Sequence, residues 1–109
     1  MRAYSLYGLT ITTTIPFRAP LRPSNSPPTL TVDDEHGTRS VASASLLSTV
    51  PEQYWNSVTI QRAIRWTDGQ DGLLFPGGDQ VVVGHGRMTY VHAGHHPPRP
   101  DWVDARLLG

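Results

Sequence analysis

The sequence predicts a mostly β domain of the α+β class: a small antiparallel sheet or meander of about five or six short strands, with one or two short peripheral helices. Ten prolines and ten glycines in 109 residues imply many turns, which favour strands over helices. Several short segments alternate apolar and polar residues, as a strand with one buried face does. The length is typical of one domain, which we expect to span residues 1–109.

The N-terminal third predicts two strands separated by a connector. Ala3 to Thr14 alternates in strand fashion and is rich in β-branched residues, so it predicts a first strand. Ala19 to Pro28 holds four prolines, which supply no backbone N–H, and predicts an extended connector. Thr29 to Val32 predicts a second strand, and the acidic run Asp33 to Gly37 predicts an exposed turn after it.

The middle of the chain predicts a short helix and then a strand. Apolar residues three positions apart (Val41, Ala44 and Leu47) favour a helix within Ser40 to Val50. Val58 to Trp66 alternates clearly, which predicts a strand with Trp66 on the core face.

The C-terminal half predicts a meander and a last helix. Short strands at Gly72 to Phe75, Gln80 to Val83 and Arg87 to His92 are separated by tight glycine turns, which predict antiparallel neighbours. Asp101 has the position of an N-cap for a terminal helix. The helix has barely two turns and ends on Leu107 and Leu108, so these leucines must be covered by this domain or lead into another.

Composition excludes several function classes. Nine basic residues balance nine acidic ones, so no basic surface predicts binding to nucleic acid or to an anionic membrane. The chain has no cysteine, which excludes disulfides, thiolate metal sites and cysteine nucleophiles. The sequence has neither a signal-peptide pattern nor an apolar stretch long enough to span a membrane. We therefore expect a cytoplasmic protein.

Four histidines are the candidates for a metal site: His85, His92, His95 and His96. Three of them fall within five residues, and imidazoles are common zinc ligands. The run lies in a loop flanked by glycine and proline, with no nearby carboxylate before Asp101, so a solvated loop is the competing interpretation. Zinc that copurifies and is lost on His92→Ala would decide for the metal site.

No serine lies in a nucleophile elbow, and no lysine lies in a glycine-rich phosphate loop. The sequence therefore predicts no catalytic residues and no cofactor. Exposed aromatic and apolar side chains outside the patterned strands are instead candidates for an interface. These are Tyr54, Trp55, Trp102, Leu107 and Leu108.

Two regions resemble a known family. The first region comprises Tyr4 to Ile11, Ile15 to Phe17 and the connector into Leu30 to Val32. The second comprises Leu74 and Phe75, the Gly77-Gly78 turn, Val81 to Val83, Gly86 to Val91 and Arg106 to Gly109. Together they resemble the N-terminal region of proteins similar to HPr serine kinase/phosphorylase, which precedes a P-loop kinase domain. Ser40 to Asn56 matches nothing in that region.

The resemblance implies a non-catalytic accessory or N-terminal module of a kinase-like protein, which docks a substrate or holds an assembly together. Its partner would be the kinase-like domain or a protein or peptide substrate. One alternative is a free-standing module whose sheet edge receives an extended peptide. Another is a histidine-dependent metal-binding protein. A kinase sequence in the same chain, or encoded beside it, would favour the accessory module over the free-standing one.

Overall fold

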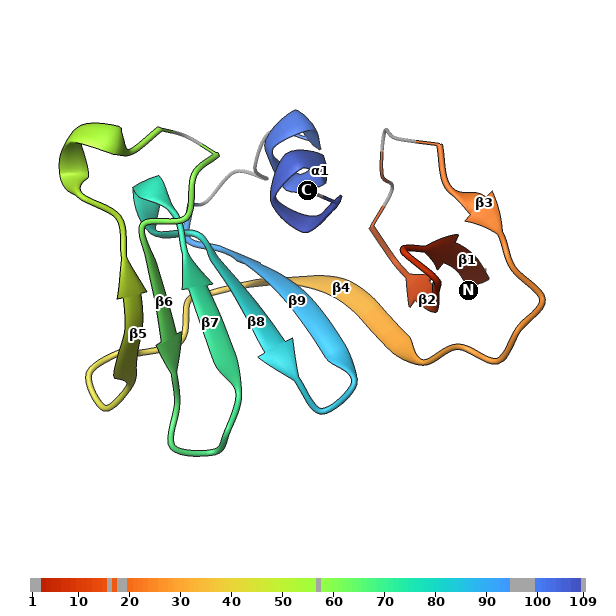
Figure 1. Cartoon of the computed structure of the whole chain (residues 1–109), viewed down its shortest axis with the longest axis horizontal. Helices are drawn as coiled ribbons and strands as arrows, with labels where there is room; N and C mark the ends of the chain where they lie inside the picture. Colours follow the sequence, from red (N-terminus) through yellow and green to blue (C-terminus); the bar gives the residue numbers. More distant parts are fainter. Residues whose placement is uncertain (1–2, 16, 18–19, 57, 95–99, 109) are drawn as a thin grey trace.

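The computed structural model describes residues 3–15, 17, 20–56, 58–94 and 100–108. These residues form one open sheet of nine strands, in the order β3-β1-β2-β4-β9-β8-β7-β6-β5, and one α-helix, α1 (Pro100–Leu108) (Figure 1). The mostly β prediction is confirmed, as is the terminal helix. The prediction of five or six strands is wrong, because the N-terminal third and residues 45–49 add strands that the sequence pattern did not reveal.

The predicted meander is confirmed and gains a fourth strand. β6 (Arg62–Arg65), β7 (Asp71–Leu74), β8 (Gln80–Gly84) and β9 (Arg87–His92) pair antiparallel in chain order. Short turns join them: the short 3-10 turn η2 (Pro76–Gly78) precedes β8, and His85 lies in the β8–β9 turn with a φ of 52°. Local turn chemistry therefore fixes this half of the sheet.

β6 is shorter than the predicted strand, Val58 to Trp66. The Asn56 side chain accepts hydrogen bonds from the backbone N–H groups of Val58 (2.9 Å) and Thr59 (2.8 Å). This local turn competes with strand geometry at residues 58 and 59. The ladder with β7 therefore begins only at Arg62.

The predicted first strand is instead a hairpin of β1 (Ala3–Leu6) and β2 (Leu9–Thr13). Tyr7 and Gly8 occupy its two-residue turn with φ values of 50° and 79°, the left-handed pair that matches the twist of a hairpin. Glycine is the usual residue there and tyrosine is not, so the alternation hid the turn. In the connector, the two-residue strand β3 (Arg22–Pro23) pairs with β1.

β4 (Leu30–His36) joins the two halves of the sheet. It pairs in parallel with β2 on one side and with β9 on the other. The predicted acidic turn is wrong, because Asp33, Asp34 and Glu35 continue this strand. Asp33 accepts hydrogen bonds from the guanidinium of Arg87 and from the Thr89 hydroxyl (2.6 Å), both on β9. These hydrogen bonds from β9 stabilise the Asp33 carboxylate within a strand, although an acidic run usually favours a turn.

β5 (Ser45–Thr49) lies at the far edge of the sheet, where the sequence predicted a helix. It pairs antiparallel with β6, with Leu46 opposite Ile64 and Thr49 opposite Arg62. The register shifts between Leu46 and Ser48, so Leu47 is the extra residue of a β-bulge. The three-residue spacing of apolar side chains was therefore misleading, because pairing with β6 overrides a weak helix signal.

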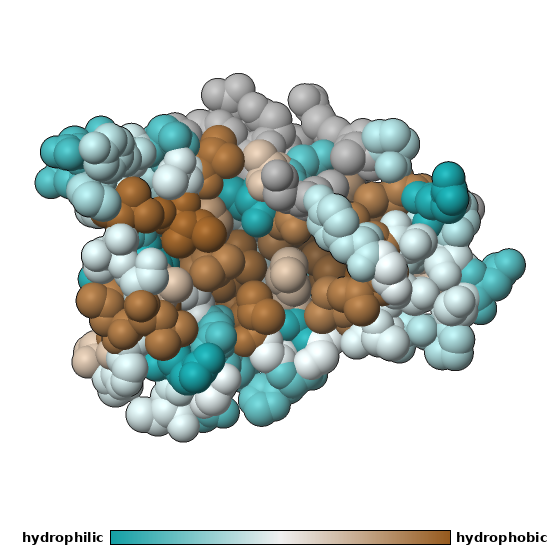
Figure 2. All heavy atoms as spheres, viewed as in Figure 1, coloured by the Kyte–Doolittle hydropathy of each residue, from teal (hydrophilic) through white to brown (hydrophobic). Residues whose placement is uncertain are grey.

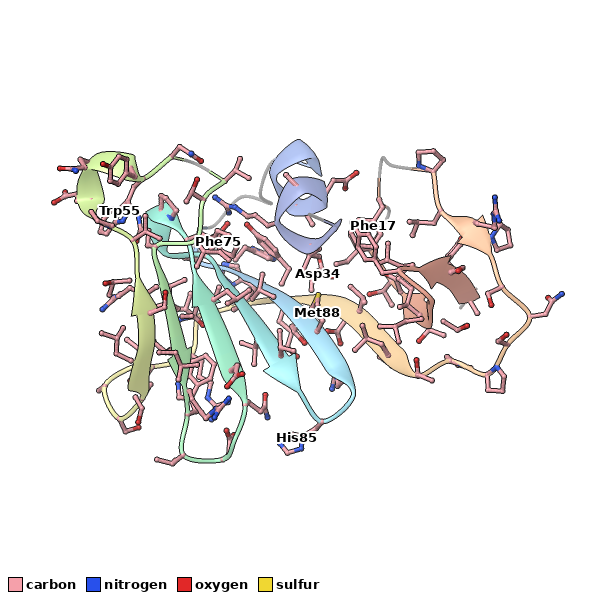
Figure 3. All side chains as sticks on the ribbon, in the orientation of Figure 1. Phe17, Asp34, Trp55, Phe75, His85 and Met88 are labelled. Atoms are coloured by element: carbon pink, nitrogen blue, oxygen red, sulfur yellow. The ribbon has the colours of Figure 1, made fainter. Side chains whose placement is uncertain are left out.

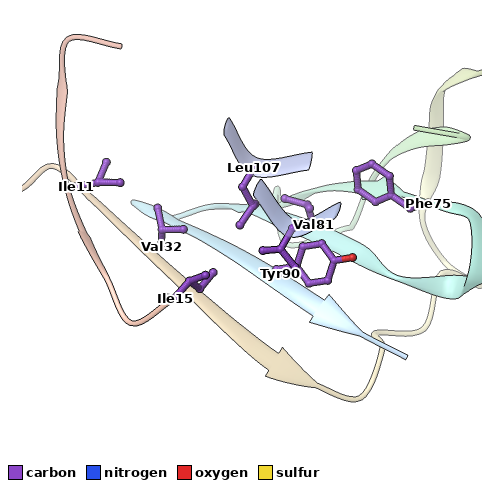
Figure 4. Packing of buried hydrophobic residues seen from close by; sticks show 8 residues of the cluster. Ile11, Ile15, Val32, Phe75, Val81, Tyr90 and Leu107 are labelled. Carbon is purple, nitrogen blue, oxygen red and sulfur yellow. The ribbon is translucent and has the colours of Figure 1, made fainter. Parts of the chain in front are cut away.

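Each face of the sheet carries its own apolar cluster. The helix side holds the larger one, in which Tyr90 and Ile11 are fully buried and Leu107 of α1 packs with Val81 (Figure 4). On the other side, Ile64, Trp66 and Leu74 pack under Val41 and Ala44. Trp66 is 3% exposed, which confirms its predicted place in the core.

The loop between β4 and β5 runs over that second cluster and is fastened to it. The Trp66 indole N–H donates to the Ser40 carbonyl (2.8 Å), and the Arg39 guanidinium lies 4.3 Å from the Trp66 ring centroid. The Gln80 side chain accepts a hydrogen bond from the Arg39 backbone N–H (3.0 Å) and donates one to the Arg39 carbonyl (2.9 Å).

The described residues contain no helix long and apolar enough to cross a membrane.

Trp66 has room for its ring because residue 72 has no side chain. A Cβ on Gly72 would lie 2.5 Å from one carbon of the Trp66 ring and 2.6 Å from another. We expect Gly72→Ala to reduce the free energy of unfolding by about 1–3 kcal/mol, the usual cost of overpacking. Urea denaturation measures this change.

The control is the same substitution in a Trp66→Leu background, where the ring that causes the clash is gone. There Gly72→Ala should cost much less, since the two positions are coupled. An equal cost in both backgrounds would contradict the close packing of Gly72 against Trp66.

Candidate functional site

The exposed apolar side chains gather at one end of the sheet. Of the seven large hydrophobic residues that are exposed in the described part of the chain, five lie between residues 46 and 58. We call these five the β5 patch: Leu46, Leu47, Tyr54, Trp55 and Val58. The other two, Tyr7 and Leu9, belong to the β1–β2 hairpin. Figure 2 shows apolar side chains gathered over the end of the sheet where β5 lies.

The strand at the centre of this patch is exposed along its whole length. All five residues of β5 are exposed, with Leu46 at 60% and Leu47 at 50%. In the described part of the chain, β5 has a strand neighbour on one side only. An edge strand presents a row of backbone N–H and C=O groups to whatever lies beside it. The patch therefore combines apolar side chains with a template for strand pairing.

The aromatic residues follow β5 on a short 3-10 turn, η1 (Glu52–Tyr54). The Trp55 indole N–H donates to the Val50 carbonyl (2.5 Å), which fixes the ring beside the end of β5 (Figure 3). Tyr54 remains 64% exposed and Trp55 39% exposed. Amphipathic rings held on a short turn are common anchors at protein interfaces.

A shallow groove of about 490 Å³ lies on the sheet face opposite α1. Val82 and Val91 contribute to its lining, together with the polar residues Glu35, Arg39, Gln70, His85, Arg87 and Thr89. Both of its arginines are engaged: Arg87 pairs with Asp33, and Arg39 pairs with Asp68 at 2.7 Å. The hydrogen bond from Arg39 lowers the pKa of Asp68 below its usual range. A carboxylate whose pKa is lowered in this way stays ionised at neutral pH and is a poor general base.

The described histidines do not converge on one point. His85 occupies the tip of the β8–β9 turn (Figure 3). His92 lies at the other end of β9, whose length is roughly 16 Å at about 3.3 Å per residue. His92 instead lies beside His36 of β4, with ring centroids 4.9 Å apart. The His36 Nε2–H donates to the Gly94 carbonyl (2.6 Å).

In the described residues, no group of three His, Asp or Glu side chains could hold a metal ion. His95 and His96 lie outside the described residues. Metal binding through them stays a prediction.

The predicted interface residues separate into three kinds. Tyr54 and Trp55 are exposed on the β5 patch. Leu107 is buried in the core of this same chain at 8% exposure. The side chains of Trp102 and Leu108 lie outside the described residues.

Sequence reasoning missed Leu46, Leu47 and Val58. The signal that could have found the leucines was the uncharged run from Ser45 to Thr49, which is bounded by Pro51 and has the length of an edge strand.

A buried polar cluster fastens α1 to the sheet. The Arg106 side chain is fully buried and donates to the Tyr90 hydroxyl and to Asp79 (3.2 Å). Tyr90 in turn donates to Asp79 (2.5 Å), which also accepts the Ala93 backbone N–H (3.0 Å). The Arg106 guanidinium lies 4.5 Å from the Phe75 ring centroid. Every member has a structural partner, so we interpret this cluster as a clamp on the helix.

Compared with known protein families, curated proteins and solved structures, the chain matches none. The resemblance to the N-terminal region of HPr serine kinase/phosphorylase therefore rests on its short motifs alone.

The buried cluster predicts a loss of stability at alkaline pH. Burial, together with the hydrogen bond to Asp79, raises the pKa of Tyr90 well above its ordinary value of 10.0. Folding thus favours the neutral phenol, so the stability that this group contributes is complete below pH 10 and is lost as the pH rises further. One such group changes the free energy of unfolding by up to about 1.4 kcal/mol per pH unit.

We expect the free energy of unfolding of the wild type to fall more steeply above pH 10 than that of Tyr90→Phe. Urea denaturation at a series of alkaline pH values measures both slopes. Equal slopes for the two proteins would contradict the burial of a neutral Tyr90.

Proposed function

We propose that this chain is a non-catalytic cytoplasmic docking module, which binds an extended segment of a protein or peptide along β5 in the service of a kinase-like protein. The observation that carries the proposal is the β5 patch, where exposed apolar side chains accompany an edge strand with one neighbour in the described part of the chain. Exposed apolar side chains that gather on one part of a surface are typical of interaction sites.

The physical basis is strand addition. An extended segment beside β5 gains backbone hydrogen bonds from the strand edge, which supply affinity for any sequence. Leu46, Leu47 and Trp55 then favour segments with apolar side chains, because covering them removes apolar area from water. The hydrogen bond that holds the Trp55 ring also lowers the entropy cost of binding at that position.

The resemblance to the N-terminal region of HPr serine kinase/phosphorylase supports the kinase-like context. In that context the bound segment belongs to the kinase-like domain or to its protein or peptide substrate. A free-standing peptide-binding module is the second candidate, and the same edge favours it. The two differ in whether a kinase accompanies the chain, and the binding surface is common to both.

The test begins with a displayed library of random peptides selected against the whole chain. We expect Leu47→Lys to weaken binding of the selected peptides by at least about tenfold, because it places a charge at the centre of the patch and removes an apolar contact. Titration of intrinsic tryptophan fluorescence measures the affinity.

Leu9→Lys is the matched control. Leu9 is 49% exposed, nearly the same as Leu47, but lies in β2 on the other half of the sheet. It should leave binding within about twofold of the wild type. Equal affinity of the wild type and Leu47→Lys, or equal losses in both variants, would overturn the proposal.

A further inference from the structure

We propose that the extended segment bound along β5 carries an acidic side chain, which pairs with Arg62 of β6 across Thr49. The inference rests on the proposed function and names the chemistry of the segment that this edge selects. The same segment carries an apolar residue beside Leu46, two positions from the acidic one.

Arg62 is an exposed cation without an ion pair among the described residues. It lies on β6, the strand next to the open edge. Glu52 on η1 is the first acidic residue after β5 along the chain, and no ion pair in the described part of the chain joins it to Arg62. Arginines elsewhere on the sheet and on α1 pair with aspartates: Arg39, Arg65, Arg87 and Arg106. The charge of Arg62 is therefore available to an acidic group of a bound partner.

The register of β5 places Arg62 and Leu46 on one face of the sheet. Thr49 pairs with Arg62. Leu46 pairs with Ile64, which lies two residues further along β6 and is buried on the face opposite α1. Paired residues point to the same face, as do residues two apart on one strand. Arg62, Thr49 and Leu46 therefore share that face, because the bulge at Leu47 shifts the register between them.

The backbone of Thr49 faces the open edge. The Val50 N–H donates to the Gln61 carbonyl across the two strands (2.8 Å). Along an antiparallel ladder, consecutive residues turn their N–H and C=O groups to opposite sides. The N–H and C=O of Thr49 therefore point away from β6 and can pair with one residue of the bound segment. The side chain of that residue then lies on the same face as Arg62.

The distance suits an ion pair between long side chains. Two strand spacings separate Arg62 from the segment residue, or about 10 Å between backbones at about 4.8 Å per spacing. Thr49 lies between them and is short, so an arginine and a glutamate can meet above it. Guanidinium and carboxylate groups then form charge-assisted hydrogen bonds.

An apolar residue of the segment completes the pattern. Leu46 is 60% exposed, so covering it removes apolar area from water. In a segment without a bulge, the residues beside Leu46 and Thr49 are two positions apart, because the extra residue belongs to β5 alone. The edge therefore selects an acidic and an apolar side chain separated by one residue.

The experiment compares peptides selected against the whole wild-type chain with peptides selected against Arg62→Glu. We expect the wild type to enrich Glu or Asp two positions from an apolar residue. Arg62→Glu should enrich Lys or Arg at the same position, because the charge opposite it is reversed.

Arg22→Glu is the matched control. Arg22 is exposed and has no ion pair among the described residues, but it lies on β3, at the opposite edge of the sheet. This variant should keep the wild-type preference for an acidic residue.

Titration of intrinsic tryptophan fluorescence measures the same preference for a single selected peptide. Replacing its glutamate by glutamine should weaken binding to the wild type by about two- to fivefold, the usual strength of an exposed ion pair. High salt should remove this difference, because it screens exposed charges. The same replacement should leave binding to Arg62→Gln unchanged.

The two proposals fail separately. Selected peptides without an acidic preference, or an equal loss from the glutamine replacement in the wild type and in Arg62→Gln, would overturn the inference. The docking function would then stand, provided that Leu47→Lys still weakens binding. If no peptide can be selected, or if Leu47→Lys binds as the wild type does, the docking function falls and this inference falls with it.

Discussion

The architecture depends on the path that the chain takes away from β4. After β4, residues 37–44 cross the sheet face opposite α1, and the chain returns through β5, β6, β7, β8 and β9 to pair with β4 again. The return is a meander, so the first strand after the crossing must lie farthest from β4. The exposed edge at β5 is therefore a consequence of topology. The edge at β5 is therefore in place whenever residues 37–44 are held across the sheet.

Two sets of contacts hold that path. Parallel pairing of β4 with β9 closes the meander, and Asp33 of β4 reinforces it by accepting hydrogen bonds from Arg87 and Thr89. Over the opposite end of the sheet, Trp66 and Gln80 fasten the crossing segment. Both sets join residues distant in sequence, so local sequence patterns do not reveal them.

The helix side is fixed by a different means. Arg106 is buried with Asp79 and Tyr90, an arrangement that costs desolvation and is compensated by its hydrogen bonds. Its contribution is the placement of α1, because these contacts join the helix to Asp79 and Tyr90 of the sheet side. This accounts for a short helix that stays docked on the sheet although a helix of nine residues is marginal alone.

The sequence predicted the parts of the fold that local chemistry controls. Glycine turns near Gly77 and Gly86 identified the meander, and the alternation around Ile64 placed Trp66 in the core. It did not predict parallel pairing of β4, because nothing near Asp33 reveals that Arg87 will neutralise it. The sequence predicts a helix at residues 45–49 for the same reason, because the strand β5 forms only through its pairing with β6. Of the β5 patch, only Tyr54 and Trp55 could be named in advance, because their exposure does not depend on strand order.

Amide hydrogen exchange of β5 most directly tests the claim that this strand is an open edge. In dilute solution, the β5 N–H groups that point away from β6 should exchange rapidly, while those of β9 exchange slowly between two neighbouring strands. On saturation with a selected peptide, the rapid β5 amides should become protected and those of β3, at the opposite edge, should not change. Protection confined to the groove around Arg87, with β5 unaffected, would contradict the claim.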